Sequence, residues 1–200
     1  MKKLLFTLAL LISAVSFGQT AEEYSDSGYD KAFVKDYYGA ISDFNKAIEL
    51  DPNLALAYYN RGISKRYLKD YYGAISDYSK AIELNPNYTD AYNNRGFSKH
   101  ILKDYYAAIS DYSKAIELDP NYALAYNNRG WSKHNLKDYY GAISDYSKAI
   151  ELDPNYSAAY VNRGASKSYL GDLKGSCADY KNAANLGDTA SAKWVASQCN

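Results

Sequence analysis

The sequence repeats with a period of 34 residues, and this period limits the possible folds more than any other feature. Two residue types mark it: Pro52, Pro86, Pro120 and Pro154, and Gly62, Gly96, Gly130 and Gly164. The segment 74–84 recurs unchanged at 108–118 and 142–152. A unit of this size cannot bury a core by itself, so tandem units are expected to stack into a solenoid.

Each unit is predicted to form two helices joined by a turn. In the second unit, apolar residues of the predicted second helix have the spacing of one buried helical face. These residues are Ala74, Ile75, Tyr78, Ala81 and Ile82. Asp70 stands where it can cap the start of this helix, and Pro86 cannot continue it. The sequence therefore predicts an all-α protein.

The repeat resembles the tetratricopeptide-repeat family over almost the whole chain. The family pattern places aromatic, small and proline residues at fixed positions. The second unit matches it at Tyr58, Gly62, Ala74, Tyr78, Ala81 and Pro86. The units are 21–54, 55–88, 89–122, 123–156 and a divergent 157–190. The resemblance implies a right-handed α-solenoid of five helix-turn-helix units.

The C-terminal end is predicted to close the array. The fifth unit has Leu186-Gly187-Asp188 in place of the proline, and a short helix from Thr189 is expected to cover the last apolar face, with residues 191–200 as its end. Cys177 and Cys199 each lie 11 residues from Asp188, where a turn would bring them together. A disulfide is predicted, and two unpaired buried thiols are the alternative.

The repeated charges depart from the family pattern. Arginine stands where that pattern has leucine, and lysine where it has tyrosine: Arg61, Arg95, Arg129 and Arg163, and Lys65, Lys99, Lys133 and Lys167. Each unit also has an aspartate in its second helix: Asp77, Asp111, Asp145 and Asp179. Because these residues are the same in the second to fifth units, we expect structural ion pairs rather than a binding site.

Residues 1–18 are interpreted as a cleaved secretory signal. Lys2-Lys3 precede a 12-residue apolar run from Leu4 to Val15, and small residues follow it. The run is short for a membrane span, so the mature chain is expected to have no stable membrane insertion. An uncleaved anchor is the alternative. Export to the periplasm or the medium is predicted.

Composition and motifs exclude several functions. Basic and acidic residues number 23 each, so the chain lacks the positive charge that nucleic-acid binding requires. The two histidines occupy one repeat column without nearby metal ligands, and no cofactor is expected. No phosphate-binding glycine loop or nucleophile motif breaks the repeat. We therefore expect a non-catalytic protein.

Differences between the units point to a binding surface. The three central units are identical at 26 of 34 columns. Five of the eight variable columns, beginning at Leu56, Tyr59, Ile63, Arg66 and Tyr67, fall on one arc of the first helix. The middle of this arc runs Tyr29, Ile63, Phe97 and Trp131, whereas drift on a solvated face would favour polar residues. In proteins that this chain resembles, the same stripe lines a concave peptide groove.

An asparagine column lies beside this stripe. Its carboxamides could hold the backbone of an extended peptide, or they could satisfy neighbouring helix ends. The predicted groove residues are Tyr59, Asn60, Ile63, Arg66, Tyr67, Asn93, Asn94, Phe97, His100, Asn127, Asn128, Trp131, His134 and Asn162. Family members that grip a terminal carboxylate add several cations there. In the groove columns next to the asparagines, Arg66 is the only arginine or lysine, so binding of a terminal carboxylate is not supported.

The predicted function is to bind an extended peptide or protein segment in this groove. The apolar anchors would be Tyr59, Ile63, Phe97 and Trp131. The charge preference would be set by Arg66, His100 and His134. The alternative is a structural role, in which the array self-associates within a cell-envelope assembly.

Overall fold

The computed structural model describes residues 19–199, and every regular element in this range is an α-helix. The first three units comprise α1 (Ala21–Phe33), α2 (Tyr37–Leu50), α3 (Ala55–Tyr67), α4 (Tyr71–Leu84), α5 (Thr89–Ile101) and α6 (Tyr105–Leu118). The rest comprises α7 (Ala123–Asn135), α8 (Tyr139–Leu152), α9 (Ser157–Tyr169), α10 (Leu173–Asn185) and α11 (Thr189–Gln198). The all-α prediction is confirmed. The predicted signal segment lies outside the described residues.

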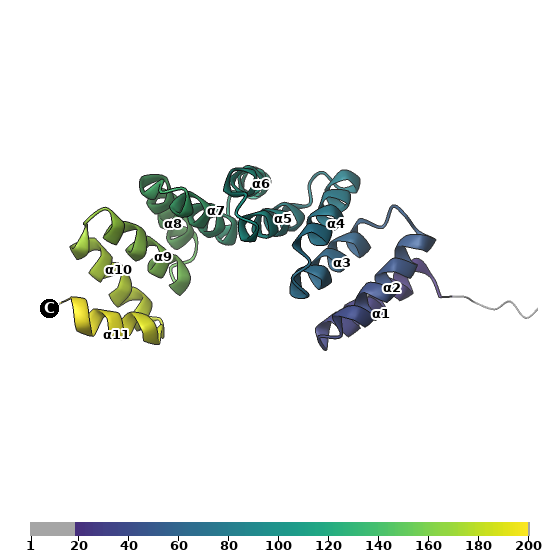
Figure 1. Cartoon of the computed structure of the whole chain (residues 1–200), viewed down its shortest axis with the longest axis horizontal. Helices are drawn as coiled ribbons and strands as arrows, with labels where there is room; N and C mark the ends of the chain where they lie inside the picture. Colours follow the sequence, from purple (N-terminus) through teal and green to yellow (C-terminus); the bar gives the residue numbers. More distant parts are fainter. Residues whose placement is uncertain (1–18, 200) are drawn as a thin grey trace, which may run out of the picture.

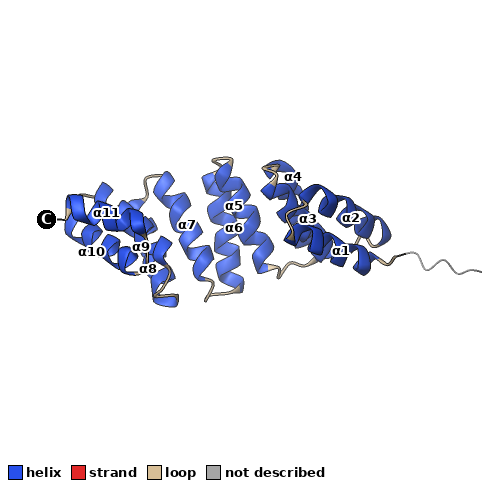
Figure 2. Cartoon of the chain, turned by 90° about the horizontal axis from the view of Figure 1, so that it is seen from below, coloured by secondary structure: helices blue, strands red, loops and turns tan. Residues whose placement is uncertain are grey.

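The helices form an arched array of stacked pairs (Figure 1). Each helix packs against the next helix in the chain, and odd-numbered helices also contact the odd-numbered helix of the adjacent unit. Closer spacing between the odd helices places them on the inner side of the arch. Figure 1 shows α5 and α9 on this side, with α6 and α10 outside them. Viewed from below, the helices lie side by side across the long axis (Figure 2).

The turn inside each pair follows from its sequence. The aspartate before each even-numbered helix caps it: the Asp70 side chain accepts a hydrogen bond from the backbone N–H of Gly73 at 2.9 Å. The preceding lysine has a left-handed backbone, with φ of 65° at Lys69. Gly171, with φ of 80°, takes this place in the fifth unit. These local signals fix where the second helix of each pair begins.

The core of each of the first four units consists mainly of one aromatic ring and several alanines. Tyr78, Tyr112, Tyr146 and Phe44 are fully buried beside alanines of the same helices. A Cβ on Gly62 would lie 2.8 Å from the Tyr78 ring, so only glycine lets the two helices approach this closely. The positions that carry the family resemblance are therefore the positions where helices meet.

Ion pairs link the two helices of a unit, and hydrogen bonds from the same arginines join adjacent units. Arg95 donates two hydrogen bonds to the carboxylate of Asp111, at 3.0 and 2.7 Å, and Lys99 lies 2.7 Å from the same carboxylate. Arg95 also donates to the Ser79 hydroxyl of the preceding unit at 3.1 Å. The same pairing recurs around Asp77, Asp145 and Asp179. The predicted structural role of these charges is confirmed.

The last helix, α11, caps the array as predicted. Cys177 on α10 and Cys199, which follows α11, form a disulfide with a Cα–Cα distance of 5.7 Å. The Trp194 ring packs on Tyr180 with centroids 4.2 Å apart. No helix within residues 19–199 has the length and apolar character needed to cross a bilayer.

Candidate functional site

The variable stripe forms one continuous surface on the odd-numbered helices. Tyr29 and Ile63 line one pocket, the rings of Phe97 and Trp131 have centroids 6.4 Å apart, and Trp131 and Ala165 line another pocket. Tyr29 is 58% exposed, and the other four side chains are half-buried. The stripe is therefore accessible from the inner side of the arch, with side chains partly held by packing.

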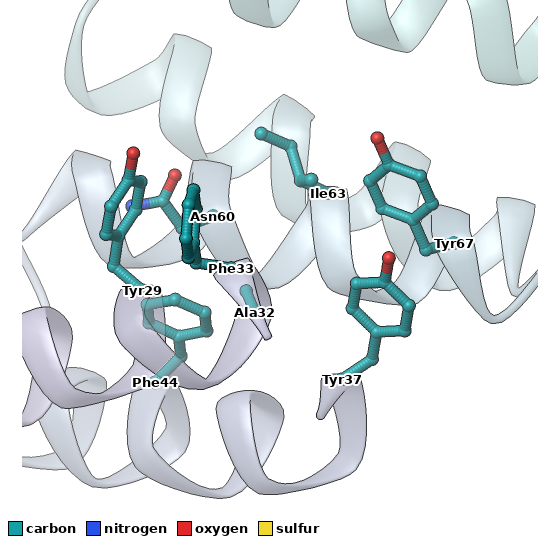
Figure 3. Close-up of a pocket in the computed structure, with 8 residues that line it drawn as sticks. All are labelled: Tyr29, Ala32, Phe33, Tyr37, Phe44, Asn60, Ile63 and Tyr67. Atoms are coloured by element: carbon teal, nitrogen blue, oxygen red, sulfur yellow. The ribbon is translucent and has the colours of Figure 1, made fainter. Parts of the chain in front are cut away.

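An apolar pocket, here named the N-terminal pocket, opens at the start of the stripe (Figure 3). Its volume is about 160 Å³. It is lined by Tyr29, Ala32, Phe33, Tyr37, Phe44, Asn60, Ile63 and Tyr67. Figure 3 shows the stacked rings of Tyr37 and Tyr67, whose centroids are 4.9 Å apart, facing Tyr29 and Phe33 across the pocket. This wall suits an apolar side chain of a ligand.

A second pocket, the central pocket, lies between α3, α5 and α7. Its volume is about 240 Å³, and its lining is Arg66, Asn93, Asn94, Phe97, Leu124 and Asn128. The Arg66 guanidinium carbon lies 4.8 Å from the Tyr67 ring centroid and 5.4 Å from that of Phe97. Burial raises the pKa of the Tyr78 hydroxyl beneath it, and the charge of Arg66 partly opposes that rise. The pocket thus combines a cation, carboxamides and apolar walls.

A third pocket, the C-terminal pocket, is smaller. It has a volume of about 80 Å³ and is lined by Trp131, His134, Tyr146, Asn162 and Ala165. Three pockets therefore follow one another along the stripe, from the first unit to the fifth. A ligand that touched all three would be an extended chain.

The asparagine column makes hydrogen bonds between units. Asn94 donates to the Tyr59 hydroxyl at 3.0 Å. Asn128 donates to Asn93 Oδ1 at 3.1 Å, and Asn162 donates to Asn127 Oδ1 at 3.0 Å. Burial raises the pKa of Tyr59 to about 12, so its hydroxyl stays protonated. These partners are side chains on the preceding odd helix, and Asn94 also donates to the backbone carbonyl of Asp90 in the first turn of its own helix at 3.0 Å.

Family models decide the class of protein. The model described as "Tetratricopeptide repeat" matches residues 55–88, 89–122 and 123–156, and a second TPR model matches 35–65. Together they cover more than half of the chain. The chain belongs to the tetratricopeptide-repeat (TPR) family.

Solved structures share the fold of this TPR array. A MamA crystal structure is 26% identical, covers 83% of this chain and 91% of its own, and has a TM-score of 0.76. YrrB, titled a TPR protein with an unusual peptide-binding site, is 23% identical, with coverages of 88% and 92% and a TM-score of 0.74. PilF from Pseudomonas aeruginosa is 19% identical, with coverages of 84% and 77% and a TM-score of 0.77. Comparison with curated proteins finds no match.

The structure corrects the roles predicted for the two histidines of the TPR groove. His100 is only 4% exposed; its Nδ1 lies 2.8 Å from the Ser132 hydroxyl, and its ring packs on Trp131 with centroids 3.7 Å apart. Burial lowers the pKa of His100 to about 4, so the ring is neutral near pH 7 and cannot set charge preference. His134 is half-buried, with its Nδ1 2.8 Å from the Ser166 hydroxyl, and burial lowers the pKa of this histidine as well.

Three predicted groove asparagines are also buried. Asn93, Asn127 and Asn128 are 3 to 7% exposed. Asn93 and Asn128 still line the central pocket, whereas Asn127 serves mainly to accept the hydrogen bond from Asn162. Close packing of adjacent odd helices buries these residues, which the spacing within one helix does not predict.

Some pocket residues of the TPR array are absent from the predicted groove set. Phe33 ends α1 in the same variable column as Tyr67, so the variation between units pointed to it, whereas Tyr37 begins α2, outside the stripe of the first helix. Tyr37 belongs to a column that is tyrosine in the first four units, so variation between units could not reveal it. Leu124 lies in a variable column, and this signal was available.

Residues 19–199 contain no group of three or more His, Cys, Asp or Glu side chains placed to hold a metal ion.

Proposed function

We propose that this TPR array binds an extended segment of another protein along its inner groove. The main observation behind the proposal is that residues which vary between the units also line the pockets of the inner groove. Five of the eight columns that differ between near-identical units lie on the first helix, and these five line three successive pockets on the inner side. Selection for recognition would change these positions and leave the packing positions unchanged.

Family membership supports the broader role of a protein-interaction scaffold. TPR proteins are generally non-catalytic scaffolds, and YrrB, which shares the fold, is described as a TPR protein with an unusual peptide-binding site. An extended segment fits the groove because its side chains can enter successive pockets while its backbone lies between them. Aromatic residues such as Trp131 often dominate the energy of such interfaces.

The proposal is tested with a random library of acetylated, amidated peptides of about 12 residues, which extend to roughly 40 Å. Peptides selected on the native protein are measured against Trp131→Ala and against Tyr140→Ala. Tyr140 is a matched control, since it is 75% exposed and lies on α8, outside the groove. We expect Trp131→Ala to weaken binding at least about fivefold, or about 1 kcal/mol, and Tyr140→Ala to leave it unchanged. Equal affinities for all three proteins would reject the groove.

Self-association in an envelope assembly is the second candidate. The first unit favours it, because Phe33 is 81% and Val34 is 71% exposed there. Light scattering across a wide concentration range tests it. A mass that rises with concentration, and that Phe33→Ser with Val34→Ser returns to the monomer value, would support this function. A constant monomer mass would exclude it.

We also propose that the chain is exported. The Cys177–Cys199 disulfide supports this, because disulfides persist in oxidising compartments. Cell fractionation with thiol labelling tests the proposal: protein found with the cytoplasm, carrying two free thiols, would reject it.

A further inference from the structure

Arg66 differs from the other arginines of residues 19–199. Arg61, Arg95, Arg129 and Arg163 each donate to an aspartate carboxylate of their own unit. Arg66 forms no such ion pair: its guanidinium group lies over the rings of Tyr67 and Phe97. Its column holds His100, His134 and Ser168 in the following units, so this cation belongs to one place on the array.

The charge of Arg66 is not balanced by an ion pair within residues 19–199. Its buried Nε and the fully buried Tyr78 hydroxyl have no other hydrogen-bond partner, and while burial raises the pKa of that hydroxyl, Arg66 lowers it. Both atoms are closed to solvent, so a ligand would pair with the rest of the guanidinium group, where an anion gains affinity because the charge is otherwise unpaired. The two flanking rings hold the guanidinium group in place, which reduces the entropy lost when it binds an anion.

The carboxamides of the central pocket add donors. Asn93 uses its Oδ1 to accept from Asn128, which leaves its Nδ2 group as a donor. Phe97 and Leu124 line the rest of the pocket. A carboxylate, which accepts several hydrogen bonds and carries one negative charge, is the group that this combination fits.

We propose that the central pocket binds the side-chain carboxylate of an aspartate or glutamate within the extended partner segment, and that a large apolar residue of that segment enters the N-terminal pocket. This inference rests on the proposed groove function. The apolar surface continues past Arg66 in both directions, to the N-terminal pocket and to Trp131. The acidic group therefore comes from a residue inside the segment, and the chain end lies elsewhere.

The groove also contains an acidic residue, Asp90. Its substitution should have the opposite effect on ligand preference to a substitution of Arg66. Asp90 is exposed on α5, where its carboxylate accepts a hydrogen bond from the Tyr122 hydroxyl at 2.6 Å. It lies in the variable stripe, so its charge opposes the approach of an acidic segment. Removing this charge should favour the same ligands that Arg66 attracts.

The test uses the same blocked peptide library, in pools with one position fixed as glutamate, glutamine or lysine. We expect native protein to enrich glutamate pools over glutamine pools by about tenfold at one position, with an aromatic or aliphatic preference on one side of it. Arg66→Gln should abolish the glutamate preference, and Asp90→Asn should increase it. Lys114→Gln, which removes an equal charge from α6 outside the groove, is the control and should change nothing.

The outcomes separate this inference from the proposed function. Peptides whose binding depends on Trp131 but shows no acid preference would overturn the inference and leave groove binding intact. An acid preference that survives Arg66→Gln, or that falls equally in Lys114→Gln, would also overturn it. A preference for acid that appears only when the peptides carry a free C-terminus would assign the pocket to a chain end instead. No binding by any peptide would overturn both.

Discussion

Among single residues, the buried aspartate of each second helix is expected to contribute strongly to the free energy of unfolding. Asp111 is 4% exposed and forms ion pairs with both Arg95 and Lys99. Asp111→Ala would leave two partly buried cations unpaired. We expect a loss of about 3 kcal/mol in the free energy of unfolding, measured by urea denaturation followed by circular dichroism.

The first unit provides a matched comparison. Asp43 occupies the same column, but Ser27 replaces the arginine and the paired Lys31 side chain is 40% exposed. Asp43→Ala therefore leaves only one, more exposed cation unpaired. We expect a loss of about 1 kcal/mol in the free energy of unfolding. Equal losses for the two variants would mean that the buried arginine pair contributes nothing beyond burial of the carboxylate.

His100 makes the stability of the protein depend on pH. Its pKa is about 4 in the folded protein because of burial, against about 6.5 in an unfolded chain. As the pH falls from 7 to 5, the unfolded state binds a proton at this site before the native state does, so native stability falls. We expect wild-type protein to lose about 1 to 2 kcal/mol more over this interval than His100→Gln. Parallel losses in both proteins would contradict a buried, neutral imidazole.

At the level of helices, the disulfide decides whether α11 stays on the array. α11 has ten residues, too few to be stable alone, and its packing centres on Trp194 against Tyr180. Cys177→Ser with Cys199→Ser should destabilise this helix by about 3 kcal/mol. We expect Trp194 fluorescence, read in a Trp131→Phe background, to change at lower urea than the bulk helicity. Coincident transitions with and without the bond would show that α11 does not need it.

Helix positions and ends followed from the sequence because their causes are local. The aspartate caps, the prolines and the glycines that face Tyr78 and its equivalents each act within one unit. The third unit shows that the cap does not require glycine. Ala107 stands in the column of Gly73, and the Asp104 side chain still accepts a hydrogen bond from the Ala107 backbone N–H at 3.2 Å.

The burial of groove residues could not be predicted in the same way. His100 is covered by Trp131 and Ser132, which lie one unit further along the array. Asn128 likewise donates a hydrogen bond to Asn93 across one unit boundary. A helical projection shows the face on which a side chain lies, but the distance between stacked helices decides whether that face remains open.

Across the whole molecule, stability is carried by contacts between neighbours. Each helix packs on adjacent helices, and hydrogen bonds such as Arg129 to Ser113 and Asn162 to Asn127 cross a single unit boundary. Such an array behaves as a chain of coupled units rather than as one cooperative globule. Central units have neighbours on both sides, whereas α1 and α2 have a neighbouring unit on one side only.

This arrangement predicts graded protection from hydrogen exchange. We expect backbone amides to exchange most slowly in α5–α8, faster in α1 and α2, and at an intermediate rate in α10 and α11, where the disulfide holds the end. Asp111→Ala should accelerate exchange mainly in α5, α6 and the helices that contact them, because the lost ion pair weakens one unit and its two boundaries. Exchange measured by mass spectrometry on peptic fragments resolves these segments. Uniform protection along the array, with uniform loss in the variant, would mean that the units unfold together and that neighbour coupling exceeds the stability of any single unit.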